Sequence, residues 1–161
     1  MFFVRTATER DLAKVSALLG ETAHAAYDAE YGAAKIDEMT AKWHSVAALK
    51  ANLQRKNGEF LVADDGKVIG GMGFASMSER LHETAVLHQL YVLPQFQRQG
   101  IARDIFAELE TCFPYAGTMR VEVEENNAKA IGFYEAHGFV RAGAGAGTWG
   151  IPTIAMEKPL D

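Results

Sequence analysis

The segment Q-R-Q-G-I-A, residues 97–102, restricts the possible folds of this chain more than any other. It follows an apolar run, residues 87–93, that is typical of a buried strand. Beyond it, Ile101, Ile105 and Leu109 recur at the spacing of one helix face. The chain therefore passes from a buried strand directly into a helix, as it does in folds that cover a sheet with helices.

This strand-to-helix junction has the chemistry of a phosphate-binding site. Its small residues, Gly100 and Ala102, let a ligand approach the backbone closely. The first turn of the helix offers unpaired N–H groups and the positive end of the helix dipole, which together bind phosphate or pyrophosphate. The P-loop ending Gly-Lys-Ser/Thr and the dinucleotide fingerprint Gly-x-Gly-x-x-Gly are both absent from the junction. We therefore expect a phosphorylated cofactor of another kind.

Size and composition indicate one soluble, cytoplasmic domain that spans residues 1–161. The chain is 48% hydrophobic, and it has neither an apolar run long enough to cross a bilayer nor a signal-peptide pattern. Its net charge of −5 argues against nucleic-acid binding, which needs a basic surface. The single cysteine, Cys112, excludes an intrachain disulfide and is expected to be buried on a helix face.

The hydrophobic patterning predicts an α+β domain with one mixed sheet flanked by helices. Thr8 and Asp11 have the spacing of a capping box at the start of a first helix. Asp65-Gly66 predicts a hairpin turn, and the glycines at 70, 71 and 73 predict a bulge or a close approach of backbone. The expected element order is β-α-α-β-β-β-α-β-α-β-β, with strands at residues 2–7, 59–64, 67–76, 84–93, 119–124, 139–143 and 151–158.

Hydrophobic periodicity indicates the helices less clearly than the strands. Periodicity predicts one helix from about Ile36 to Arg55, with Trp43 and Val46 among its inward-facing residues. Residues 23–32 have weaker periodicity and are interpreted as a helix end followed by a loop. The glycine- and alanine-rich residues 143–150 are expected to form a flexible loop.

A second motif lies about two dozen residues after the junction. Asn127, Ala130, Tyr134, Gly138 and Phe139 have the spacing N-x-x-A-x-x-x-Y-x-x-x-G-F on a short helix that ends at a C′ glycine. This motif, the preceding Q-R-Q-G-I-A loop and the element order together resemble the GCN5-related N-acetyltransferases over essentially the whole chain. The resemblance implies their acyl-CoA N-acyltransferase fold, with a mostly antiparallel central sheet and two splayed parallel strands.

The resemblance also implies acetyl-CoA as the acetyl-donating cosubstrate and no metal. Backbone amides of the loop would bind the pyrophosphate, and the adjacent strand would pair with the pantetheine arm. The last helix would contact the arm or line the acyl side, with Asn127 either touching the arm or holding the helix opening. The implied CoA-binding residues are Leu90, Tyr91, Val92, Gln97, Arg98, Gln99, Gly100, Ile101, Ala102, Arg103, Asn127, Ala130, Phe133 and Tyr134.

Two catalytic roles follow from the resemblance. Tyr134 matches the general acid of the family, which protonates the departing thiolate; a phenol has an unperturbed pKa of about 10 and is protonated at neutral pH. His88 occupies the position of a histidine in arylalkylamine-type members and would be the general base, with an unperturbed pKa of about 6.5. Packing of His88 in the sheet, Glu83, Glu124 and ordered water remain alternatives for the base.

The acceptor is expected to be a small-molecule primary amine. In the family the first two helices and their connection shape the acceptor pocket, and here that region offers Tyr27, Asp28 and Tyr31. Aromatic rings and carboxylates suit a cationic amine, and the region is similar to that of polyamine acetyltransferases. A protein N-terminus or lysine as acceptor, and a non-catalytic acyl-CoA sensor, are alternatives. A homodimer is compatible with the resemblance.

Overall fold

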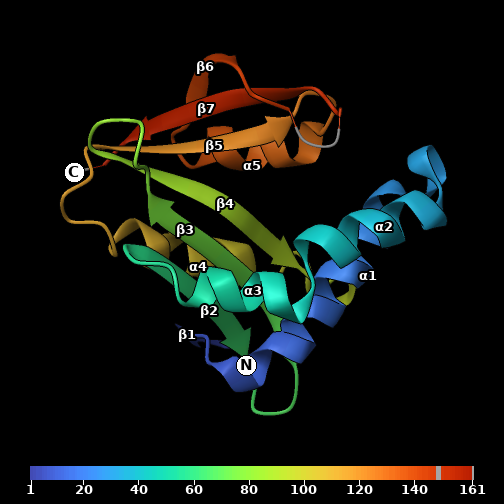
Figure 1. Ribbon diagram of the computed structural model, residues 1–161. Coiled ribbons are helices and arrows are strands. Elements are labelled where there is room, and N and C mark those ends of the chain that lie inside the picture. Colours follow the sequence, from blue (N-terminus) through green and yellow to red (C-terminus); the bar gives the residue numbers. More distant parts are fainter. Residues whose placement is uncertain (148–149, 161) are drawn as a thin grey trace. The chain divides into compact units, whose positions relative to one another are not determined.

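The computed structural model describes residues 1–147 and 150–160. The chain divides into two compact units (Figure 1): the first contains Met1–Ala75 and Gln89–Cys112, and the second contains Ser76–His88 and Phe113–Asp161. The elements of the first unit are β1 (Phe3–Thr6), the 3-10 turn η1 (Glu9–Asp11), α1 (Leu12–Tyr31), α2 (Ala33–Trp43), α3 (Val46–Leu53), β2 (Gly58–Asp64), most of β3 (Ile69–Met77), the end of β4 (Thr84–Val92), η2 (Pro94–Phe96) and α4 (Ile101–Glu110). Those of the second are the start of β4, β5 (Thr118–Glu124), α5 (Ala128–Ala136), β6 (Val140–Ala144) and β7 (Thr153–Pro159).

The strands form a mixed sheet in the order β1-β2-β3-β4-β5-β7-β6. β4 and β5 run parallel, whereas β1 and β2, β5 and β7, and β6 and β7 run antiparallel. The described parallel register covers Thr84–Leu87 against Thr118–Val121 and ends before His88. The mixed sheet flanked by helices confirms the predicted fold class.

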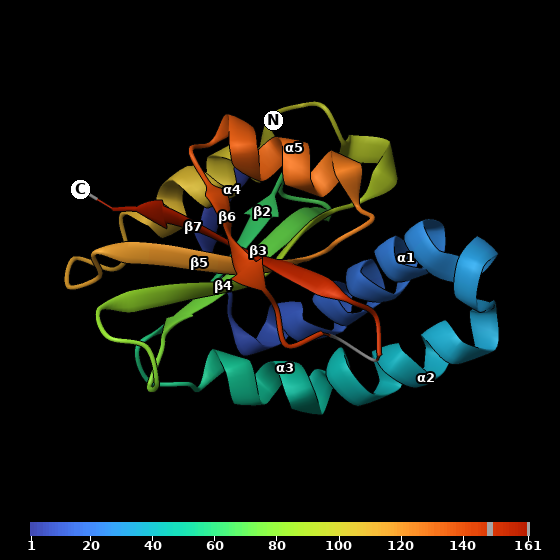
Figure 2. The same cartoon turned by 90° about the horizontal axis from the view of Figure 1, so that it is seen from above.

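Helices cover both faces of the strands in the first unit (Figure 2). The helices α1 and α3 lie on one face. Met72 and Phe74 of β3 belong to the same buried cluster as side chains of these helices, including Leu12 and Leu49. On the other face α4 lies so close to β3 that a Cβ at Gly71 would be 2.8 Å from Cγ2 of Ile101. At Gly73 a Cβ would be 2.6 Å from Cγ2 of Ile105. The close approach predicted from these glycines is confirmed.

A partly buried charge network anchors the N-terminal strand. Arg5 on β1 donates to Asp11 in η1 at 2.8 and 2.9 Å and to Asp64 at the end of β2 at 2.9 and 3.1 Å. Thr8 and Asp11 form the predicted capping box. These bonds hold the pKa of Asp11 at about 2, chiefly through the guanidinium of Arg5.

Two helix predictions were wrong. α1 continues without interruption to Tyr31, where Gly32, with φ of 84°, ends it; the predicted loop in residues 23–32 is helical. The helix predicted from Ile36 to Arg55 is two helices, because Ser45 is an N-cap whose side chain accepts from the N–H of Ala48.

Three side chains also differ from the prediction. Trp43 and Val46 flank this break and are 52% and 46% exposed rather than inward-facing. Cys112 lies beyond the end of α4 and is only partly buried, and its thiol donates to the carbonyl of Glu108. The first two residues of the predicted loop at 143–150 belong to β6, which ends at Ala144. Residues 148–149 of this segment lie outside the described residues.

Candidate active site

The junction between β4 and α4 is a tight turn stabilised by its own side chains. After η2, the side-chain amide of Gln97 donates to the carbonyl oxygen of Val92 at 3.2 Å. Arg98 and Gly100 then take positive φ angles of 64° and 83°. Residues in the left-handed backbone conformation turn the chain sharply into the helix. They direct successive N–H groups toward one side.

The first turn of α4 has the donors that an anion needs. The first helical bond runs from the N–H of Asp104 to the carbonyl of Gly100, so the N–H groups of Ile101, Ala102 and Arg103 precede it. Residues 97–99 and Arg103 are exposed, which leaves this side of the helix terminus accessible. The arrangement fits the pyrophosphate of a CoA molecule, and the implied binding residues Gln97, Arg98, Gln99, Gly100, Ile101, Ala102 and Arg103 all belong to it.

Strand β4 supplies the other residues of the first unit that were assigned to the cofactor. Leu90 and Tyr91 are partly buried and Val92 is buried. Their stretch of β4 lies beyond the described parallel register with β5, which ends at Leu87. The backbone that was predicted to receive the pantetheine arm is therefore outside the described β4–β5 pairing.

Helix α5 in the second unit positions the second motif. Asn127 is its N-cap, and its side-chain oxygen accepts from the N–H of Ala130 at 3.1 Å. This contact agrees with the expectation that Asn127 holds the helix opening. Gly138, with φ of 94°, follows the helix end, as the sequence predicts.

Tyr134 lies on the buried side of α5. Its side chain is 8% exposed, and its ring packs edge-on against Phe133 and Phe139, each with ring centroids 5.3 Å away. Two aromatic neighbours fix the plane of the phenol ring. The motif therefore places one oriented phenol in the second unit.

His88, also in the second unit, is exposed at the position where β4 leaves its register with β5. Its Nε2 lies 2.8 Å from Oγ of Ser76, which is only 1% exposed. The buried hydroxyl holds one ring nitrogen of His88 and so restricts the orientation and tautomer of the imidazole. The sequence pattern did not reveal Ser76, because a serine at the end of a glycine-rich strand carries no motif.

The three residues predicted for the acceptor belong to the first unit and share the last turns of α1. The rings of Tyr27 and Tyr31 are 6.1 Å apart, and Nζ of Lys35 lies 5.3 Å from the ring centroid of Tyr31. Oδ1 of Asp28 is 2.6 Å from Nδ1 of His24, whose Nε2 is 2.7 Å from Oδ1 of Asp37 on α2. The two carboxylates raise the pKa of His24.

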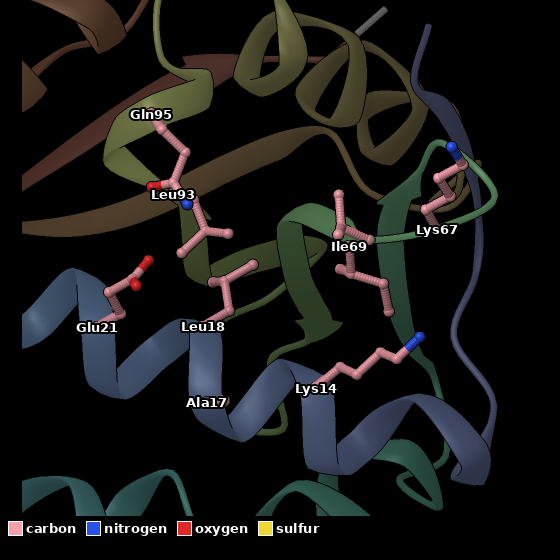
Figure 3. A pocket seen from close by; sticks show the side chains of 9 residues that line it. Lys14, Ala17, Leu18, Glu21, Lys67, Ile69, Leu93 and Gln95 are labelled. Carbon is pink, nitrogen blue, oxygen red and sulfur yellow. The ribbon is translucent and has the colours of Figure 1, made fainter.

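A cavity of about 280 Å³ lies elsewhere in the first unit (Figure 3). Side chains from α1 face the start of β3 and the end of β4 across it. Its lining contains none of the predicted site residues and consists of Lys14, Ala17, Leu18, Glu21, Lys67, Val68, Ile69, Leu93 and Gln95.

The described part of the chain offers neither a metal centre nor a membrane-spanning helix. Within residues 1–147 and 150–160, no three His, Cys, Asp or Glu side chains are grouped as a metal ion would require. In the same ranges, no helix is long and apolar enough to cross a membrane.

Comparison with known proteins decides the family. Residues 27–160 match the family model described as an acetyltransferase (GNAT) domain. The chain belongs to the GNAT acetyltransferases. It is therefore an N-acetyltransferase, and the predicted acetyl donor of this enzyme, acetyl-CoA, is confirmed. A search of curated proteins finds no match.

Solved structures confirm the fold of the enzyme. It is similar to the PaiA N-acetyltransferase from Thermoplasma acidophilum in complex with coenzyme A, with 21% identity, 99% of each chain covered and a TM-score of 0.85. The ribosomal-protein-S18-alanine N-acetyltransferase from Escherichia coli gives 21% identity and a TM-score of 0.72, with 100% of this chain and 95% of that chain covered. An acetyltransferase from Thermus thermophilus gives 18% identity and a TM-score of 0.76, with 99% and 97% covered.

Proposed function

We propose that this GNAT enzyme transfers the acetyl group of acetyl-CoA to a primary amine of a small molecule such as a polyamine. The observation that carries the choice of acceptor is the ammonium of Lys35, which lies 5.3 Å from the ring centroid of Tyr31. An alkylammonium is the functional group of the proposed acceptor. The side chain of Lys35 places a group of this kind over an aromatic ring of α1. Cation–π attraction to an aromatic ring suits such a group.

The reaction in this proposal is direct transfer. The loop residues Gln97–Arg103 bind the pyrophosphate, and Leu90–Val92 align the pantetheine arm. His88 removes a proton from the ammonium, and the free amine attacks the thioester carbonyl to form the amide. The C–S bond breaks, and Tyr134 gives its proton to the departing thiolate. The proton that the attacking nitrogen loses on becoming an amide passes through water and restores the phenol. His88 is held for this role by Ser76, which lies 2.8 Å from its Nε2.

The remaining expectations belong to the same proposal. One domain over residues 1–161, a cytoplasmic location and a homodimer stay predictions from the sequence and the family resemblance.

Thiol release from acetyl-CoA tests the function. The purified enzyme is offered spermidine, tryptamine, kanamycin, free amino acids, and peptides with a free N-terminus or a lysine. We expect turnover with at least one small amine and a preference for it over the peptides. Acetylation of the peptides alone would make the enzyme a protein acetyltransferase, and tight CoA binding without any turnover would indicate an acyl-CoA sensor.

A further inference from the structure

The cavity of about 280 Å³ in the first unit has no part in the proposed acetyl transfer. Small-molecule sites in proteins have volumes of about 300–1,000 Å³, so this cavity is large enough for a small ligand but not for a long chain segment. All the residues that line it belong to the first unit. The ligand that it suits can therefore be argued from this unit alone.

The middle of the cavity is apolar. Leu18 of α1 and Ile69 at the start of β3 are buried, with 2% and 6% of their surface exposed. Leu93, just beyond β4, is partly buried and packs against the core cluster. Val68 beside Ile69 is 40% exposed, which is high for a large apolar side chain. A hydrocarbon chain in the cavity would cover this apolar surface.

The two ends of the cavity have opposite charge. Lys14 and Lys67 lie on one side of the apolar residues, and Glu21 and Gln95 lie on the other (Figure 3). Lys14 and Glu21 are seven residues apart on α1, which places them on the same helix face and about 10 Å apart along its axis. The cavity thus presents ammonium groups at one end, and a carboxylate with a side-chain amide at the other.

These charges are not used within the protein. In residues 1–147 and 150–160, the ion pairs include neither Lys14 nor Lys67 nor Glu21. Asp65 is close to Lys67 in sequence, but its Oδ1 accepts from the backbone N–H groups of Lys67 and Val68, both at 2.8 Å. A ligand can therefore pair with these side chains without breaking an existing ion pair.

The walls of the cavity are held by hydrogen bonds and ring packing. The N–H of Leu93 donates to the carbonyl of Gly70 at 2.9 Å, which ties the end of β4 to the start of β3. In η2, the N–H of Phe96 donates to the carbonyl of Leu93 at 2.9 Å, and the ring of Phe96 packs edge-on against Phe2. A ligand that enters a cavity with fixed walls loses little free energy to ordering the protein.

We propose that this cavity is a second small-molecule site, which binds a linear ω-amino acid. The carboxylate of such a ligand pairs with Lys14 and Lys67, and its methylene chain covers Leu18, Ile69 and Leu93. Its ammonium donates to the carboxylate of Glu21 and to the side-chain oxygen of Gln95. Glu21 repels the second carboxylate of a diacid, and the two lysines repel the second ammonium of a diamine.

Binding is tested by NMR titration of the enzyme without acetyl-CoA, so the result does not depend on turnover. The probe is 6-aminohexanoate, and we expect saturable shifts of the amide signals of Ala17, Ile69 and Leu93. Hexanoate and hexylamine each lack one charge and should bind about two- to fivefold more weakly, because an exposed ion pair contributes little. Adipate and 1,6-diaminohexane should bind more weakly still. Absence of saturable shifts, or equal affinity for all five compounds, overturns the proposal.

Charge-removing variants identify which end of the ligand each side chain binds. Glu21→Gln should abolish the preference for 6-aminohexanoate over hexanoate, and Lys14→Met combined with Lys67→Met should abolish the preference over hexylamine. Glu30→Gln and Lys56→Met make the same changes at exposed positions outside the cavity and should leave both preferences intact. Preferences that survive in the cavity variants would show that the ligand binds elsewhere.

A space-filling variant tests the cavity without changing charge. Ala17→Phe fills the cavity and should abolish binding of 6-aminohexanoate, whereas Ala13→Phe, at an exposed position of α1 outside the lining, should not. Melting temperatures confirm that both variants fold. Thiol release with the best amine of the panel should be the same in Ala17→Phe as in wild type. Loss of both binding and turnover would make the cavity the acceptor site and overturn the proposal of a second one.

Discussion

His24 on α1 bridges to Asp37 on α2, with its Nε2 2.7 Å from Oδ1 of the carboxylate. Its other ring nitrogen lies 2.6 Å from Oδ1 of Asp28 on its own helix. The two ring nitrogens can donate to carboxylates at the same time only when the imidazole is protonated. A single charged ring therefore joins α1 to α2.

This contact makes the first unit's stability depend on pH. The carboxylates of Asp28 and Asp37 raise the pKa of His24, so the stabilisation is full below its ordinary pKa of 6.5 and is lost as pH rises through the raised value. We expect His24→Gln to lower the urea midpoint at pH values below 6.5 and to have little effect in alkaline buffer. An equal loss at both pH values would show that the charge of His24 contributes nothing.

Replacement of the predicted acid should slow catalysis without unfolding the enzyme. Tyr134→Phe keeps the ring that packs between Phe133 and Phe139 but removes the proton donor. We expect kcat to fall by roughly 10²- to 10⁴-fold, while the melting temperature changes little. Tyr115→Phe, at a residue that is 86% exposed, is the matched control and should retain full activity. A Tyr134→Phe enzyme of normal kcat would exclude the phenol as the acid.

The left-handed turn before α4 should be essential for acetyl-CoA binding. Gly100→Ala places a Cβ at φ of 83°, which costs about 1–2 kcal/mol, and 2.6 Å from Nη2 of Arg103, which must move. Gly66→Ala imposes the same backbone strain at φ of 94° in the β2–β3 turn, with no atom within 4 Å of the new Cβ. Both variants should lose stability, but only Gly100→Ala should raise the KM for acetyl-CoA. An unchanged KM would remove the loop from the cofactor site.

Glycine in β3 should be required for packing of α4. Gly73→Ala puts a Cβ 2.6 Å from Cγ2 of Ile105 and 3.0 Å from Cδ1 of Leu109, and overpacking of this kind costs about 1–3 kcal/mol. Gly20→Ala in α1 meets no atom within 4 Å and should stabilise the helix by up to about 1 kcal/mol. Urea unfolding of the two variants should therefore give changes of opposite sign.

The Arg5 network should be lost at acid pH. Asp11 has a pKa of about 2, so its contribution is present above its ordinary value of 3.8 and disappears as pH falls through 2. Asp11→Asn should cost about 1–2 kcal/mol at pH 7, after allowance for the partial exposure of Arg5, and progressively less below pH 3.8. Glu9→Gln changes a neighbouring exposed carboxylate and should have a much smaller effect. Equal losses for the two variants would contradict this assignment.

Local patterns predicted the features that depend on neighbouring residues. The capping box at Thr8 and the hairpin turn at Gly66 were visible in the sequence, because each depends on short-range geometry. The glycine at 73 predicted a close approach of backbone, but its partner, α4, lies far along the chain and was not identified. The continuous α1 was missed, since polar and aromatic residues obscure its periodicity while His24 and Asp37 tie it to α2.

Contacts between distant residues were beyond such patterns. Ser45 was not recognised as an N-cap, because it lies inside a stretch whose apolar spacing is helical on both sides. The pairing of Ser76 with His88 depends on how two strands align, which no local motif specifies. The burial of Nδ1 of His44 and Oε1 of Gln89 likewise depends on residues distant in the sequence, which no local motif specifies.

The peptide bond between His88 and Gln89 is where β4 passes from the second unit into the first. Consecutive Cα atoms are separated by about 3.8 Å across a trans peptide, whatever else in the molecule moves. The proposed base, His88, is therefore joined by a continuous stretch of strand to Leu90–Val92, the backbone proposed to align the pantetheine arm. Two peptide bonds separate the Cα atoms of His88 and Leu90 in every conformation of the enzyme, so an insertion between them is the change that would alter this spacing.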